Sequence, residues 1–282
     1  MNGCDLMPLR LVLSLSLLTG FCSSTYAQSY RRATTSAGIP VSWASYCIDL
    51  RLNKRGSERL APAVLEQELL GSMNAWSSTE CGGIELGLLG TSPLEEVGYV
   101  LEAENENLLV FRSGPGRWPH DPRVLALTTV TMCQNDSDLC AAGTILDADI
   151  EFNEEHFTFT GTDEPTQFDL ANTMTHELGH LLGFDHSLKT ASTMYASALP
   201  GQTYMRDLDE VDIEGLCAVY PTRPSGCDPP PEGTMLGDGG AAPIEAPVGC
   251  AAGTRGPITE TFYYLLLAIL FSLHRRRLQH GG

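Results

Sequence analysis

The stretch HELGHLLGFDH, residues 176–186, places three histidines, a glutamate and a glycine at fixed intervals in a chain that has only seven histidines. His176 and His180 are four residues apart, and in a helix this spacing stacks the two imidazoles on one face. Two imidazoles so placed can chelate one Zn²⁺. Gly183 can end the helix because glycine accepts a positive φ, and the resulting turn brings His186 back as a third ligand.

Three neutral nitrogen ligands leave one position of a tetrahedral zinc ion open for water, which is typical of a catalytic site. Glu177 follows the first ligand directly and can act as the general base that takes a proton from the activated water. We therefore predict metal-assisted hydrolysis. Two alternatives are a zinc-stabilised surface-binding module without catalysis and a zinc hydrolase that acts on something other than protein. The intact Glu177 and the open position argue against the first.

The elements that must position these residues follow from hydrophobic periodicity. The stretch 167–184 spaces its apolar residues as one face of a helix, which carries the histidines. A second helix is expected over 61–76, with Pro62 near its start. Strands are expected over 41–53, 84–90, 107–113, 124–132 and 143–153. This order predicts an α+β fold in which helices pack against a mixed sheet.

The strand 143–153 alternates sharply, and this alternation predicts that only one of its faces is buried. One face carries Leu146, Ala148, Ile150 and Phe152, and the other carries Ile145, Asp147, Asp149 and Glu151. The aspartates can in principle hold Ca²⁺, but an ordinary solvated face is the favoured interpretation.

Composition limits the range of partners. The chain has 282 residues, 43% of them hydrophobic, and a formal net charge of −18. Nucleic acid is excluded as a partner because phosphate binding needs clustered Lys and Arg. The length suits one substantial domain plus a tail, and we expect a monomer that acts on protein or peptide substrates.

Both ends of the chain carry targeting signals. Residues 1–27 resemble a signal peptide, because Arg10 precedes a short apolar run that leads to small residues. A short segment, 28–39, precedes the domain at 40–221. A Pro/Gly-rich linker, 222–257, follows it, and 258–282 holds an apolar segment and an arginine cluster. The tail resembles bacterial sorting tails of the MYXO-CTERM type around Cys250, and a plain short membrane anchor is an equal alternative. We expect an exported product, either anchored at the cell surface or released.

Export makes disulfide bonds plausible, because cysteines outside the cytoplasm are usually oxidised. Cys133 and Cys140 are close enough in sequence to staple a loop. Among several possible pairings of the others, we consider Cys47 with Cys81 and Cys217 with Cys227.

The pattern HExxHxxGxxH at 176–186 resembles the metzincin metallopeptidases. HSLKTASTMYAS (186–197) places Met194 eight residues after His186, and this spacing is similar to the matrixin branch. The stretch 208–221 is similar to the helix that closes a matrixin catalytic domain. The resemblance is strong over 170–221 and diffuse from residue 40 up to that point.

This resemblance implies a five-stranded twisted sheet, three helices and a zinc-dependent endopeptidase activity. It makes residues 124–132 the edge strand that pairs with the substrate backbone. It implies that Met194 is a wall beneath the metal and not a ligand. The histidines of a second, structural zinc site in animal matrixins have no recognisable counterpart in His120 and His156, so we predict one zinc.

Overall fold

The computed structural model describes residues 30–138, 140–222 and 251–252, which form a mixed sheet with helices packed against it. Four strands run parallel in the order β4–β3–β5–β7, and β6 pairs antiparallel with β7 at the sheet edge. The two-residue strand β2, Ser42–Trp43, joins the start of β7. The long strands are β3 (Cys47–Asn53), β4 (Glu85–Ser92), β5 (Asn107–Phe111), β6 (Ala126–Met132) and β7 (Thr144–Phe152). The predicted α+β class is confirmed. The expected strand 41–53 is divided into β2 and β3, and the other four expected strands are present.

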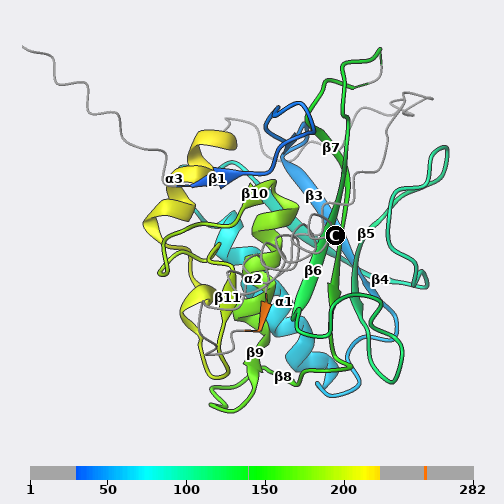
Figure 1. Ribbon diagram of the computed structural model, residues 1–282, viewed down its shortest axis with the longest axis vertical. Coiled ribbons are helices and arrows are strands. Elements are labelled where there is room, and N and C mark those ends of the chain that lie inside the picture. The colour runs from blue at the N-terminus through cyan, green and yellow to red at the C-terminus, as the bar shows by residue number, and fades with distance from the viewer. Residues whose placement is uncertain (1–29, 139, 223–250, 253–282) are drawn as a thin grey trace, which may run out of the picture.

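Two helices cover one face of this sheet (Figure 1). Helix α1, Pro62–Ser77, begins with a proline in its first turn, where the missing N–H costs nothing. Helix α2, Leu170–Leu181, packs between α1 and β6. Helix α3, Glu210–Val219, lies beyond them and follows a short 3₁₀ turn, η1, at Tyr204–Arg206. Apolar side chains of α1, α2 and the inner sheet face form one continuous core.

Short strands tie the loops to this framework. β1 (Arg31–Arg32) pairs antiparallel with β10 (Phe184–Asp185), and β8 (Phe159–Thr160) pairs in parallel with β9 (Phe168–Asp169). β11 (Ser197–Ala198) pairs in parallel with β12 (Ala251–Ala252), which is drawn in orange in Figure 1. β1 and β10 matter most for the site, because β10 directly precedes His186.

The outer face of β7 is buried, which corrects the predicted solvated face. Asp147, Asp149 and Glu151 are at most 2% exposed. The backbone N–H groups of Gly98, in the loop between β4 and β5, and of Leu108 in β5 donate to the carboxylate of Asp149. Arg112 and His120, which follow β5, contact the carboxylate of Glu151. Apolar and acidic side chains do alternate between the two faces of β7, as predicted. Residues from distant parts of the sequence, however, bury the acidic face as well.

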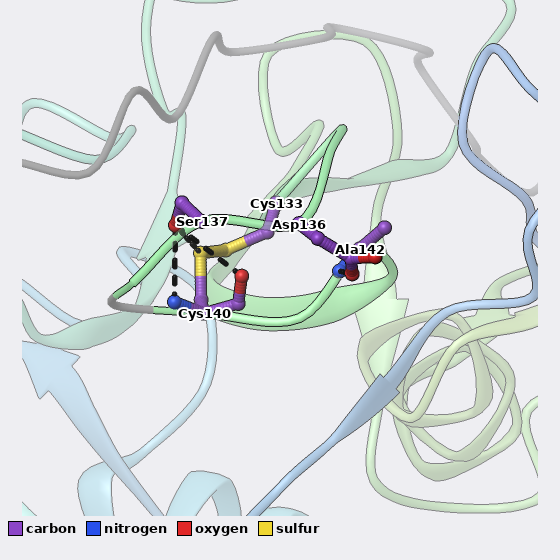
Figure 2. The surroundings of a disulfide bond; sticks show 5 residues. All are labelled: Cys133, Asp136, Ser137, Cys140 and Ala142. Carbon is purple, nitrogen blue, oxygen red and sulfur yellow. Dashed lines mark hydrogen bonds between the residues drawn. A yellow bond between two sulfur atoms is a disulfide. The ribbon is translucent and has the colours of Figure 1, made fainter.

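Two disulfide bonds are described in full. Cys133 and Cys140 close the loop between β6 and β7, as predicted (Figure 2). Cys81 is bonded to Cys217 of α3, so the pairings of Cys47 with Cys81 and of Cys217 with Cys227 were wrong. Those two pairings joined cysteines that are close in sequence, whereas the fold brings Cys81 and Cys217 together over a separation of 136 residues. Cys47 is also disulfide-bonded.

Several predictions fall on other parts of the chain. The signal peptide, most of the linker and the apolar segment 258–282 lie outside the described residues. Within the described ranges, none of the helices has the length and apolar character that a bilayer crossing requires.

Candidate metal centre

Helix α2 is anchored firmly at its start. The carboxylate of Asp169 caps it by accepting a hydrogen bond from the backbone N–H of Asn172 at 2.8 Å. Arg206 of η1 pairs with the same carboxylate from the other side. Every residue of the helix is buried, so the histidines are carried by a rigid element of the core.

The end of α2 is shaped by three residues from other elements. The indole Nε1–H of Trp43 donates to the backbone carbonyl of Leu181 at 2.8 Å. The hydroxyl of Tyr220 donates to the backbone carbonyl of Leu182 at 2.8 Å. These carbonyls would otherwise lack a partner at the helix terminus. Gly183 has φ +86°, and a Cβ there would lie 2.6 Å from the carbonyl oxygen of Val41, so only glycine fits the turn.

The three histidines of the motif converge after this turn. The Nε2 atoms of His176 and His180 are 3.0 Å apart, and those of His180 and His186 are 3.2 Å apart. Tetrahedral ligands at the usual Zn–N distance would be separated by about 3.3 Å. Of the residues described, this is the single cluster of three or more side chains able to share a metal ion. The donor set therefore fits a zinc ion.

The second nitrogen of two of these rings is held by a backbone carbonyl. Nδ1 of His176 lies 2.7 Å from the carbonyl oxygen of Thr193, and Nδ1 of His180 lies 2.8 Å from that of Phe184. Each carbonyl can only accept, so Nδ1 carries the proton and Nε2 keeps its lone pair for a metal. Burial lowers the pKa of His176 to about 3 and lowers the pKa of His180 and His186, so all three rings are neutral at pH 7.

His186 is positioned by the residue before it. The carboxylate of Asp185 accepts a hydrogen bond from the backbone N–H of His186 at 2.7 Å. Asp185 also forms an ion pair with Arg31 of β1 at 3.3 Å. The β1–β10 pairing therefore fixes the segment that leads into the third histidine.

Met194 lies in the core beside α2 and is 3% exposed. Gly179 faces it, and a Cβ at this position would collide with the sulfur of Met194 and the ring of Trp76. Asp212 of α3 fixes the segment that leads into Met194. Its carboxylate accepts hydrogen bonds from the Ser192 hydroxyl at 2.6 Å and from the Thr193 N–H at 2.7 Å. Asp212 thus fixes the carbonyl that orients His176.

The carboxylate of Glu177 is fully buried beside β6. The hydroxyl of Thr128 donates to its Oε2 at 2.7 Å. Neither Thr128 nor Asp212 was predicted from the sequence as a functional residue. Only the position of Asp212 three residues after the cap residue Asp209 had a sequence signal, that of a helix capping box.

The two other described histidines lie outside the cluster. Nε2 of His120 is 3.1 Å from the carboxylate of Glu151, which also pairs with Arg112 at 2.5 Å. Nδ1 of His156 is 3.0 Å from Oδ1 of Asn153. Both are thus engaged by other side chains, Glu151 of β7 and Asn153 just after it.

The site lies in the part of the chain that is similar to known proteins. Residues 135–221 match a family model described as Matrixin. Metalloendoproteinase 1 of Glycine max is 40% identical over 57 residues, which are 20% of this chain and 18% of that protein. Metalloendoproteinase 1-MMP of Arabidopsis thaliana is 41% identical over 56 residues, 20% of this chain and 15% of that protein. The chain thus spans less than a fifth of the length of these curated relatives.

Proposed function

We propose that this chain is a zinc-dependent endopeptidase of the matrixin type that hydrolyses peptide bonds in protein or peptide substrates. The observation that carries the proposal is the convergence of three neutral Nε2 atoms, two of them on the helix that also carries Glu177. The matrixin match over 135–221 supports the same activity. The cleavage of peptide bonds and the protein or peptide nature of the substrates are both proposed.

His176, His180 and His186 are the residues that would hold the zinc. When bound, the ion supplies Lewis-acid polarisation of the scissile carbonyl and lowers the pKa of a water molecule. Glu177 receives the proton of that water at a carboxylate oxygen and delivers it to the leaving nitrogen. Met194 packs beneath the histidines and supports their helix without ligating.

The substrate would approach along β6. Among the described strands β6 pairs with β7 alone. Its second edge can therefore accept an extended peptide by strand addition, in which backbone hydrogen bonds hold the substrate. This arrangement favours cleavage within a chain, because such pairing needs extended backbone rather than a free terminus.

A peptidase assay on the full-length protein tests the function. We expect cleavage of casein or of a quenched peptide, loss of cleavage on treatment with a chelator, its return with Zn²⁺, and inhibition by a hydroxamate. Glu177→Ala is the matched control, because it leaves the three histidines in place. This variant should bind zinc and lose activity by several orders of magnitude.

The same experiment separates the alternatives. A protein that binds zinc and cleaves no peptide would support the non-catalytic surface-binding module. Peptidase activity that persists unchanged in Glu177→Ala would remove the glutamate from the mechanism. Ca²⁺ binding by acidic side chains stays a prediction that the zinc experiment does not address.

Export and surface attachment are a further part of the proposal. The Cys81–Cys217 and Cys133–Cys140 disulfides support an oxidising compartment, since such bonds rarely persist in the cytoplasm. Mass spectrometry of the native protein tests the expected removal of residues 1–27 and processing near Cys250. An N-terminus found at Met1 in the mature protein would contradict export by a cleaved signal peptide.

A further inference from the structure

Thr128 is the side chain of β6 that meets the proposed general base. Its Oγ1 lies 2.7 Å from Oε2 of Glu177 and 3.2 Å from the backbone carbonyl oxygen of the same residue. Both residues are 0% exposed. One hydroxyl therefore contacts both ends of Glu177, which fixes the side chain relative to its own helix.

The direction of the hydrogen bond follows from the groups involved. An ionised carboxylate can only accept, so the hydroxyl of Thr128 donates to it. A hydrogen bond to an ionised acceptor is stronger than a neutral one, and the 2.7 Å distance to Oε2 is the shorter of the two contacts. The backbone carbonyl at 3.2 Å is the secondary acceptor.

Thr128 is well suited to hold the carboxylate in one orientation. The terminal torsion of a glutamate is broad and roughly two-fold, so the carboxylate rotates unless a partner fixes it. Threonine is stiff about χ1 because its Cβ is branched. The strand that carries it is paired with β7 along its whole length and packs directly against α2.

We propose that Thr128 positions the general base: its hydroxyl donates to Oε2 of Glu177 and holds the carboxylate in one orientation for proton transfer. This inference rests on the proposed function and assigns to Thr128 a role beyond packing. The proton moves from water to the carboxylate of Glu177 and then to the leaving nitrogen. The hydrogen bond from Thr128 to Oε2 stays in place during both transfers, so the geometry of proton transfer is preserved.

Three variants of the full-length chain test the role. Thr128→Val keeps the shape of the side chain and removes the hydroxyl, whereas Thr128→Ser keeps the hydroxyl and removes the methyl group. Thr131→Val makes the same chemical change at a buried threonine of the same strand. Residues 128 and 131 point to opposite faces of β6, so Thr131 does not face Glu177.

We expect Thr128→Val to bind zinc as the parent does and to lose about tenfold to a hundredfold in kcat, with KM little changed. Thr128→Ser should recover most of the loss, and Thr131→Val should keep the parental kcat. Full kcat in Thr128→Val would overturn the proposal. So would loss of zinc from that variant, because Thr128 would then serve the metal centre as a whole.

A second measurement does not depend on activity. Thermal unfolding of the zinc-free chain is compared for the parent, Thr128→Val, Glu177→Ala and the double variant. A direct contact predicts that loss of the hydroxyl lowers the melting temperature only when Glu177 is present. Equal shifts in the two backgrounds would contradict the contact. If the parent cleaves no peptide, the proposed function fails while this comparison still decides whether Thr128 holds the carboxylate.

Discussion

His186 is held differently from the other two proposed ligands. His176 and His180 are at most 1% exposed and each has Nδ1 on a backbone carbonyl, whereas His186 is partly exposed and is fixed through its backbone N–H by Asp185. We expect His186→Ala to leave the fold intact and to weaken zinc binding on the order of a hundredfold or more, since a direct ligand contributes at least as much as the groups that orient it.

Competition with a metal-binding dye measures this affinity. His156→Ala is the control, because His156 contacts Asn153 and lies outside the cluster. Full zinc occupancy in His186→Ala at the affinity of the parent would mean that the third ligand is another residue.

Gly179 is, like Gly183, a position of the motif where packing requires the absence of a side chain. A Cβ there would collide with Met194 and Trp76, and these neighbours are buried in the core. Gly179→Ala should therefore destabilise the fold by about 1–3 kcal/mol through overpacking, despite the better helix propensity of alanine.

Thermal unfolding measures this effect. Gly71→Ala is a suitable control, because a Cβ at this glycine of α1 has open space around it. A Gly179→Ala variant as stable as Gly71→Ala would show that the contact with Met194 relaxes at no cost.

At the scale of elements, β7 carries a buried carboxylate pair. Burial and the neighbouring Asp149 carboxylate raise the pKa of Asp147 to about 8. Asp149 accepts two backbone N–H groups and so keeps the negative charge, while Asp147 keeps the proton. Since the folded pKa lies above the unfolded value of about 3.9, this pair favours folding at low pH. That contribution is present in full below about pH 4 and is lost progressively as the pH rises to about 8.

Asp147→Asn tests this reasoning, because an amide mimics the protonated carboxyl group at every pH. We expect parent and variant to melt at similar temperatures near pH 4, and the variant to melt increasingly higher than the parent as the pH rises to 8. Thermal unfolding across this range gives the answer. A difference that is constant with pH would show that Asp147 does not titrate in the fold.

The disulfide between Cys81 and Cys217 ties the segment after α1 to α3 over a separation of 136 residues, whereas Cys133–Cys140 closes a separation of only 7. Loop-closure entropy predicts that Cys81→Ala/Cys217→Ala costs about 5 kcal/mol and that Cys133→Ala/Cys140→Ala costs about half as much. Denaturant unfolding of the two double variants checks the order. Equal losses would mean that native contacts, and not chain entropy, dominate.

The elements also show what periodicity can and cannot predict. The strands and the helices α1 and α2 were placed within a few residues, because each buries an apolar face that its own sequence encodes. The order of the strands and the burial of Asp149 were not predicted. The burial of Asp149 involves Gly98 and Leu108, which contact it from more than 40 residues away in sequence. For the same reason the motif revealed the proposed ligands but not Thr128 or Asp212.

At the scale of the whole molecule, the proposed zinc would link parts of the chain that are distant in sequence. Its ligands come from α2 and from the segment after β10, and α3 supports them through Asp212. A metal that binds only the folded chain stabilises it by about 4 kcal/mol at a concentration of a thousand times Kd. Chelation should therefore lower the melting temperature, and returned Zn²⁺ should restore it.

The partners of the remaining described histidines predict one zinc per chain. His120 and His156 are engaged by Glu151 and Asn153, and the ion pair of Glu151 with Arg112 places a fixed positive charge where a second cation would have to sit. Metal analysis of the purified protein should give one zinc, and the double variant His120→Ala/His156→Ala should keep it. Two zinc ions in the parent and one in this variant would show that His120 and His156 help to hold a second metal, and that Glu151 acts as a ligand and not as the partner of Arg112.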